Sequence, residues 1–248
     1  MNNTKNSPSG VRGMILAAGL GTRLKPWTDQ HPKALAIVNN KSLLQRNIEY
    51  LRSYGIKEVI VNVHHFADQI IDTINANNGW DSDITISDET NKVLETGGGL
   101  KKAAWYFAKD ENFLLMNADI LTDMNLHDFI QQHQQQNNLA TLAVSDRKSS
   151  RYFLFDETQH LCGWENVNTG ERKITRNAGT VIPLAFSGIH CINTKIFPLI
   201  KQEGKFSMVD VYLDLSANNN IGYYNHTGCK FIDVGKPESI AKAAEMFG

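Results

Sequence analysis

The sequence of 248 residues predicts an α/β fold, in which helices cover both faces of a mainly parallel sheet. Two observations support this class. Short apolar runs alternate with helix-like stretches, and a glycine-bearing loop follows the first apolar run. Open α/β sheets bind their ligands at the carboxyl end of such a strand. A ligand site is therefore expected at residues 18–33.

The first half of the chain carries the alternation most clearly. Residues 42–54 are predicted to form a helix, because Ser42 can cap it, Leu44 and Ile48 share one face, and Gly55 can end it. The expected strands are residues 11–18, 59–63, 84–87, 113–116 and 139–144. The other expected helices are residues 66–74, 97–108 and 126–135.

After residue 145 the pattern changes to strands that are separated by turns. Polar, glycine-bearing stretches at residues 147–151 and 166–183 are expected to be loops near a ligand or surface hairpins. The expected strands are residues 152–155, 160–164, 184–192 and 230–234. The expected helices are residues 194–203, 208–217 and 237–247.

The composition limits the classes of partner that the protein is expected to bind. The formal net charge is -1, so no nucleic acid or membrane partner is indicated. The polar residues 1–10 are expected to form a flexible lead-in, since they cannot serve as the apolar part of a secretory signal. Cys162, Cys191 and Cys229 are scattered and lack metal-binding spacing, which favours a reduced, cytoplasmic protein. The oligomeric state is left open.

The loop GLGTRLKP at residues 19–26 has the features of a phosphate-binding loop. Its glycines allow close backbone approach, Thr22 supplies a hydroxyl, and Arg23 supplies a forked cation. It is not a dinucleotide fingerprint, because Leu24 takes the place of the third glycine and Pro26 follows at once. No Gly-Lys-Ser/Thr follows at the spacing of a P-loop. A dinucleotide-dependent oxidoreductase is therefore disfavoured.

Several blocks of the chain together resemble the sugar-1-phosphate nucleotidyltransferases, and most closely the N-acetylmuramate-1-phosphate uridylyltransferases. They are LAAGLGTRLKP at 16–26, PK at 32–33, ETGGG at 95–99, LMNADI at 115–120, FSGI at 186–189 and FIDVG at 231–235. The resemblance implies a Rossmann-like three-layer α/β/α fold in one domain, residues 11–248. Residues 11–145 would bind the nucleotide and residues 146–248 the sugar phosphate. The implied substrates are a nucleoside triphosphate, in particular UTP, and a sugar 1-phosphate.

Asp119 and Asp233 each end an apolar strand, at the sheet edge where ligands bind. Two carboxylates, phosphate oxygens and waters would satisfy Mg²⁺. Either aspartate alone could equally cap a helix or a turn, but each stands in a block that resembles the family, and this resemblance implies that the pair holds this cofactor. The attacking phosphate oxygen is already ionised at neutral pH, which makes a general base unnecessary. Catalysis would then depend on cations and positioning, and Arg23, Lys33 and Asp119 are the predicted catalytic residues.

The resemblance also implies contacts to each substrate. The predicted nucleotide-binding residues are Ala18, Gly19, Gly21, Thr22, Thr96, Gly97 and Gly98. The predicted sugar-phosphate residues are Glu165, Asn177 and Gly188. Two departures stand out: no lysine matches the one that would hold the sugar phosphate, and Lys236 follows Gly235 where the family usually has threonine.

Other activities stay open at this point. Within the enzyme class they are guanylyl transfer to mannose or heptose 1-phosphate and cytidylyl transfer to phosphocholine. Residues 32–35, PKAL, are similar to the last of these. A catalytically silent nucleotide-sugar sensor is a different class, and the presence of all four residues Arg23, Lys33, Asp119 and Asp233 argues against it.

Overall fold

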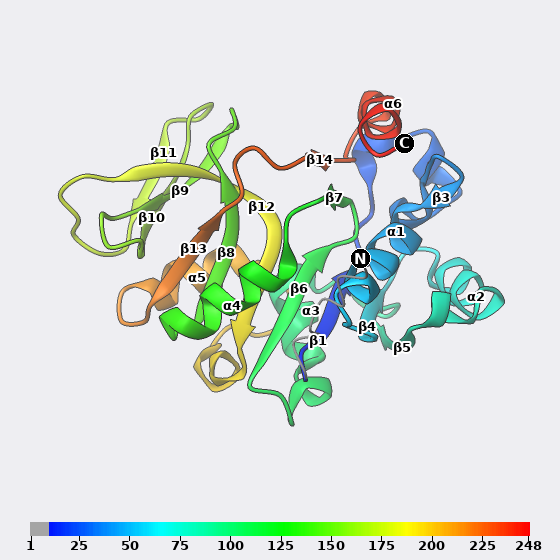
Figure 1. The fold of residues 1–248 in the computed structure, drawn as a ribbon, viewed down its shortest axis with the longest axis horizontal. Helices are drawn as coiled ribbons and strands as arrows, with labels where there is room; N and C mark the ends of the chain where they lie inside the picture. Colours follow the sequence, from blue (N-terminus) through cyan, green and yellow to red (C-terminus); the bar gives the residue numbers. More distant parts are fainter. Residues whose placement is uncertain (1–9) are drawn as a thin grey trace, which may run out of the picture.

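The computed structural model describes residues 10–248, so nine of the ten lead-in residues fall outside the described part of the chain. The centre of the main sheet is formed by four parallel strands (Figure 1): β6 (Asn112–Asn117), β1 (Arg12–Leu16), β4 (Glu58–Val63) and β5 (Asp83–Asp88), in that order. Their side chains alternate between two cores: Ile15 and Val61 face one, and Met14 and Ile60 face the other. Because both of their faces are buried, β6, β1 and β4 are apolar along most of their length, whereas the edge strand β5 is more polar and more exposed.

Helices cover both faces of this sheet and complete the predicted three-layer α/β/α fold. The face of Ile15 is covered by α1 (Leu43–Ser53), α2 (Ala67–Ala76) and α4 (Leu126–Gln136). The face of Met14 is covered by α3 (Glu95–Lys102) and α5 (Met208–Ser216). Helix α1 begins as predicted, since the Ser42 hydroxyl accepts a hydrogen bond from the Gln45 N–H (3.1 Å).

The second half extends the same sheet with mostly antiparallel strands. Strand β12 (Ile182–Asn193) connects the halves, because it pairs with β6 and also with β8 (Ala140–Ser145) and β9 (Arg151–Phe155). The remaining strands here are β10 (Leu161–Asn166), β11 (Glu171–Ile174) and β13 (Ile221–Asn225), of which β13 runs parallel to β8.

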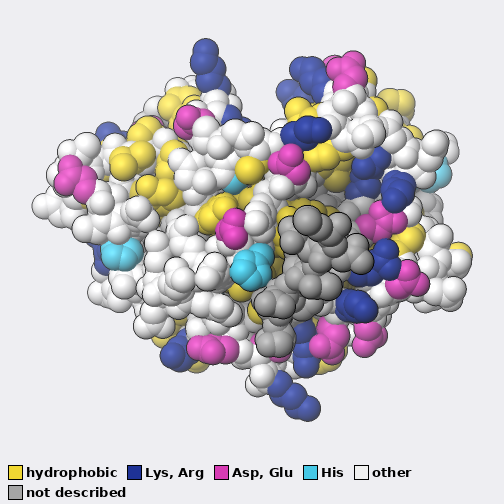
Figure 2. All heavy atoms as spheres, viewed as in Figure 1, with side chains coloured by type: hydrophobic (Ala, Val, Ile, Leu, Met, Phe, Trp, Pro, Cys, Tyr) yellow, Lys and Arg dark blue, Asp and Glu magenta, His cyan; other side chains and the backbone are white. Residues whose placement is uncertain are grey.

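Two small antiparallel sheets lie beside the main one: β14 (Phe231–Asp233) with β7 (Ile120–Thr122), and β2 (Ile37–Val38) with β3 (Lys41–Ser42). After β13 the chain crosses the top of the molecule in Figure 1, through β14, to helix α6 (Pro237–Met246). The outline in Figure 2 is notched on the same side, between the two halves. The last segment of the chain thus returns to the first half.

The sequence-based expectations differ from the structure at two helices and at several short strands. The helix expected at 97–108 begins earlier, as α3, and gives way to a 3-10 helix at Ala104–Phe107. The helix expected at 194–203 is a 3-10 helix, Thr194–Leu199, which contains Pro198. The stretch at 166–183, expected as a loop near a ligand or a surface hairpin, holds the second strand of the exposed hairpin of β10 and β11. Strands β2, β3, β7 and β13 were not expected from the sequence. Further 3-10 helices are Thr22–Leu24, Trp27–Asp29, Lys33–Leu35 and Asn78–Asp81. Within residues 10–248, no helix is long and apolar enough to cross a membrane.

Three buried histidines make the fold sensitive to acid. Burial lowers the pKa of His133 and of His226 to about 4, and that of His190 to about 3. Since the unfolded histidines take up protons near pH 6.5 and the folded ones do not, stability is full above this pH and falls below it. We expect each to remove about 2 kcal/mol of unfolding free energy between pH 7.5 and 5.0.

Urea unfolding at the two pH values measures this loss. In His133→Gln, the difference between pH 7.5 and 5.0 should shrink, whereas in His31→Gln, which changes an exposed residue, it should stay the same. A pH dependence that is identical in wild type and His133→Gln would show that this side chain does not contribute.

Candidate active site

The glycine-bearing loop after β1 is packed at one glycine and open at the other. Gly21 has φ = +63°, and a Cβ there would stand 2.9 Å from both Lys33 Cβ and Thr28 Cγ2. The Thr28 hydroxyl also donates to the Gly21 carbonyl (3.0 Å). At Gly19, by contrast, no atom of residues 10–248 lies within 4 Å of a Cβ position, its chain neighbours apart. Gly21 is therefore required by the fold, whereas the space at Gly19 is free for a ligand.

Four charged side chains of alternating sign gather beyond this loop; we call Arg23, Lys33, Asp119 and Asp233 the charge cluster. Lys33 Nζ forms an ion pair with Asp119 Oδ2, and both side chains are mostly buried. Arg23 Nη2 lies 3.9 Å from Asp233 Oδ2, and both of these side chains are about half exposed. The structure thus brings together the three predicted catalytic residues and the second predicted metal ligand.

Backbone pairing places the two carboxylates next to each other. Strand β14 runs antiparallel to β7, with Asp233 opposite Ile120, and the Val234 N–H donates to the Asp119 carbonyl (2.9 Å). Loss of hydration and the nearby charge of Asp119 raise the pKa of Asp233, while Lys33 and Arg23 oppose this shift. The carboxylates are therefore close enough to repel, and cations on both sides offset that repulsion.

The ETGGG block at residues 95–99 packs against another segment of the same chain, residues 204–208. The N–H groups of Gly97 and Gly98 donate to the Phe206 carbonyl (2.9 and 3.2 Å), and a Cβ at Gly98 would overlap the Gly204 carbonyl. The Thr96 hydroxyl accepts a hydrogen bond from the Met208 N–H (2.9 Å). The three glycines permit this close packing in the first turn of α3. Contact of Thr96, Gly97 and Gly98 with a nucleobase stays a prediction.

The sequence-based reasoning missed a buried polar network beneath the loop. Asn62 Oδ1 accepts from the Ala17 N–H (2.7 Å), and Asn62 Nδ2 donates to Glu89 Oε1 (2.8 Å). A Cβ at Gly99 would stand 2.7 Å from Glu89 Oε1, which explains the third glycine of the block. Burial raises the pKa of Glu89. The available signal was Asn62 itself, a polar residue inside the apolar strand VIVNV.

The predicted sugar-phosphate residues are dispersed. Gly188 lies in an irregular part of β12 with φ = +72°, and a Cβ there would stand 2.7 Å from Asn117 Nδ2, at the end of β6. Glu165 on β10 pairs with Arg172 (3.8 Å). Asn177 is exposed in the loop after β11. Within residues 10–248, neither Glu165 nor Asn177 has a hydrogen bond or ion pair with the charge cluster.

Arg147 is a second residue that the sequence did not single out. Its guanidinium lies over the Phe231 ring (4.7 Å to the centroid), and its Nη2 donates to the Phe186 carbonyl (2.7 Å). Its positive charge also lowers the pKa of Asp233. The loop at 147–151 was expected near a ligand, and Arg147 is its member that reaches the charge cluster.

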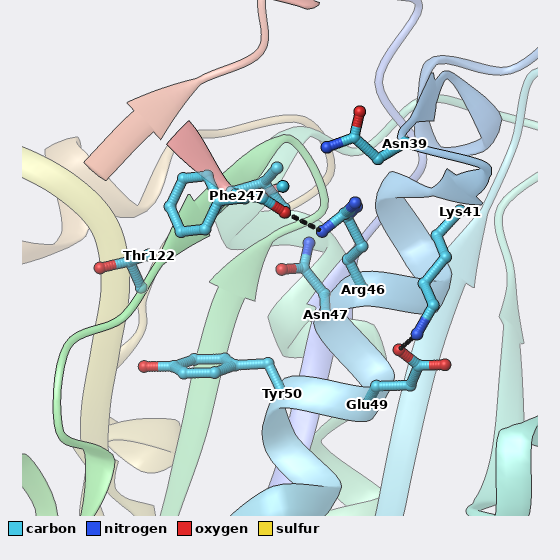
Figure 3. A pocket seen from close by; sticks show the side chains of 10 residues that line it. Asn39, Lys41, Arg46, Asn47, Glu49, Tyr50, Thr122 and Phe247 are labelled. Atoms are coloured by element: carbon cyan, nitrogen blue, oxygen red, sulfur yellow. Dashed lines mark hydrogen bonds and ion pairs between the residues drawn. The ribbon is translucent and has the colours of Figure 1, made fainter. Parts of the chain in front are cut away.

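A cavity of about 470 Å³ lies between α1, β7 and the end of the chain (Figure 3). Its polar side chains already have partners: Lys41 Nζ donates to Glu49 Oε2 (2.6 Å), and Arg46 Nη1 donates to the backbone carbonyl of Phe247 (3.4 Å). On its wall, Asn47 Nδ2 donates to the Ala118 carbonyl (2.8 Å). Asn47 therefore fixes the backbone next to Asp119.

Comparison with known proteins identifies the family. The model of the family described as "Nucleotidyl transferase" matches residues 12–247. The chain belongs to the nucleotidyl transferase family. Its relatives include the N-acetylmuramate alpha-1-phosphate uridylyltransferase of Caulobacter vibrioides, at 28% identity over 93% of this chain and 97% of the relative. The mannose-1-phosphate guanyltransferase of Yarrowia lipolytica is 27% identical over 96% of this chain, which spans 64% of that relative.

Solved structures agree with the fold of this nucleotidyltransferase. HddC from Yersinia pseudotuberculosis, complexed with GMP-PN, matches with a TM-score of 0.76 and 26% identity over 96% of this chain and 100% of HddC. A putative glucose-1-phosphate thymidylyltransferase from Bacillus anthracis matches with a TM-score of 0.78 at 16% identity, which supports the fold alone. The Rossmann-like fold class is confirmed.

The charge cluster of this nucleotidyltransferase fits a divalent ion of the Mg²⁺ type. Asp119, in the turn before β7, and Asp233, at the end of the paired strand β14, supply hard oxygen ligands. No third carboxylate, histidine or cysteine joins them within the described residues. Mg²⁺ commonly takes one or two carboxylates and completes its octahedron with phosphate oxygens and waters, so two are sufficient.

Mutation can distinguish the role of Gly19 in ligand binding from the role of Gly21 in stability. Because the space at Gly19 is open, Gly19→Ala should leave the melting temperature unchanged and weaken binding of a nucleoside triphosphate roughly tenfold or more, through contact with phosphate. Gly21→Ala should instead lower stability by about 1–3 kcal/mol, because of its positive φ and its close neighbours.

Thermal unfolding and nucleotide titration of both variants check this contrast. Gly179→Ala is the matched control, since Gly179 also has no neighbour within 4 Å of a Cβ position and lies outside the loop. Unchanged nucleotide affinity in Gly19→Ala would remove the loop from the binding site.

Proposed function

We propose that this nucleotidyltransferase condenses a nucleoside triphosphate with a sugar 1-phosphate to give a nucleotide-sugar and pyrophosphate. The first candidates are UTP and N-acetylmuramate 1-phosphate. The observation that carries the proposal is the charge cluster, in which two cations and two carboxylates meet at the carboxyl ends of the parallel strands. Such a site suits the joining of two polyanions.

In the proposed reaction, an oxygen of the sugar phosphate attacks the α-phosphorus of the nucleotide. As that bond forms, the bond from the α-phosphorus to the bridging oxygen breaks, and pyrophosphate leaves with the electron pair. The nucleophile is ionised at neutral pH, so no side chain has to remove a proton. Lys33 would neutralise charge between the two substrates, and Arg23 would stabilise the departing pyrophosphate.

Asp119 and Asp233 would hold Mg²⁺, which when bound would neutralise phosphate charge. Lys33 already pairs with Asp119, so its ammonium group stands beside one of the carboxylates that would hold the metal. Gly188 is the predicted sugar-side residue nearest to this edge, because it packs on Asn117. A cytoplasmic location belongs to the same proposal.

A second candidate is guanylyl transfer to mannose 1-phosphate. It is supported by the guanyltransferase relatives and by the likeness to HddC complexed with GMP-PN. Uridylyl transfer is preferred because the uridylyltransferase relatives match over nearly the full length of both chains.

Pyrophosphate release tests the proposed function. The protein is incubated with Mg²⁺, one of UTP, GTP, CTP, ATP or dTTP, and one of a panel of sugar 1-phosphates or phosphocholine. We expect the fastest release with UTP and N-acetylmuramate 1-phosphate, and none after chelation of the metal. Preference for GTP and mannose 1-phosphate would support the second candidate. The absence of release with every pair would contradict the enzyme and favour a sensor.

Asp119→Asn tests the assignment of the site. The amide keeps the shape of the side chain and removes its charge, so turnover should fall roughly hundredfold or more while the fold is retained. Asp72→Asn, which changes an exposed carboxylate of α2, serves as the control and should keep wild-type turnover. Wild-type turnover in Asp119→Asn would exclude this residue from the site.

A further inference from the structure

A second cavity, of about 440 Å³, opens next to the charge cluster, between the glycine-bearing loop and the start of α6. Its lining comes from Arg23 and from the segment around the start of α6: Asp233, Gly235, Lys236, Glu238, Ser239 and Lys242. No residue of β9 to β12 lines it. The cavity therefore extends the site on the side of Arg23, separately from the predicted sugar-phosphate residues.

The charges around this cavity are unequal. Arg23, Lys236 and Lys242 are positive, whereas Asp233 and Glu238 are negative. Among the described residues, the one ion pair within 4.0 Å that involves any of these five is that of Arg23 with Asp233, at 3.9 Å. Lys236 and Lys242 thus line the cavity without a carboxylate partner. If Asp233 is engaged with a metal, the excess of positive charge rises further.

The wall that carries Lys236 is held in place by local contacts. A Cβ at Gly235 would stand 2.7 Å from both Arg23 Nη2 and Asp233 Oδ1, so the ion pair lies directly on the glycine backbone. The Ser239 hydroxyl accepts from the Lys236 N–H (3.1 Å) and donates to the Lys236 carbonyl (2.6 Å). Lys236 therefore projects from a fixed backbone position beside Arg23.

We infer that Lys236, on the wall of this cavity, contacts the terminal phosphate of the nucleotide and then pyrophosphate. The inference rests on the proposed function. The pyrophosphate group carries several negative charges and leaves on the side of Arg23, which the cavity adjoins. A lysine is a compact point charge with three donors, which suits a phosphate that must also be released.

Calorimetric titration of the full chain with pyrophosphate, without metal or nucleotide, tests the inference. Lys236→Met should weaken pyrophosphate binding roughly tenfold, the loss of one charged hydrogen bond, and Lys236→Arg should largely restore it. Lys109→Met removes an exposed lysine elsewhere and should bind like wild type. Equal pyrophosphate affinity in wild type and Lys236→Met, or an equal loss in Lys109→Met, would overturn the assignment.

Competition between UTP and pyrophosphate tests whether the two ligands bind in the same cavity. UTP should displace pyrophosphate from the wild-type protein, because both would use the same cavity; simultaneous binding would overturn the inference. In the reverse reaction, Lys236→Met should raise the KM for pyrophosphate and leave the KM for the nucleotide-sugar unchanged. If no substrate pair releases pyrophosphate, the proposed function fails, but the titrations still decide whether Lys236 binds this anion.

Discussion

The pairing of β14 with β7 is the constraint on which the candidate site depends. Asp119 and Asp233 lie far apart in the sequence, and this short two-stranded sheet sets them side by side. The same pairing brings Asp233 within 3.9 Å of Arg23 and leads the chain into α6, which lines the second cavity. One register of backbone hydrogen bonds therefore positions the carboxylates, one of the cations and the proposed pyrophosphate cavity.

Adjacent carboxylates carry an electrostatic cost that the surrounding cations offset. The pKa of Asp233 is raised by lost hydration and by Asp119, and lowered by Lys33, Arg23 and Arg147. These cations come from the opening loop and from the loop after β8, so both halves of the chain contribute to the balance. A site of this kind favours ligands that bring alternating charge, such as a divalent cation together with phosphates.

The sequence predicted much of the fold and the membership of the charge cluster. Apolar runs identified the parallel strands, and Ser42 marked the start of α1 correctly. The charge cluster was predictable because the strand-end aspartates and the loop cations stand in recognisable blocks. β7 was missed because it is three residues long and pairs with the equally short β14. The packing of Phe206 on Gly97 was also missed, because tertiary contacts, rather than local propensity, decide where such a segment lies.

Buried polar contacts were the least predictable part. Nothing local in the sequence indicates that Asn62 and Glu89 meet beneath the loop, or that Arg147 lies over Phe231.

The central claim, that Asp119 and Asp233 share one divalent ion, is tested most directly by titrating Mn²⁺ in the presence of UTP and following the free ion by electron paramagnetic resonance. The account predicts that Asp119→Asn and Asp233→Asn each weaken Mn²⁺ binding roughly tenfold or more. Wild-type Mn²⁺ affinity in either variant would contradict it.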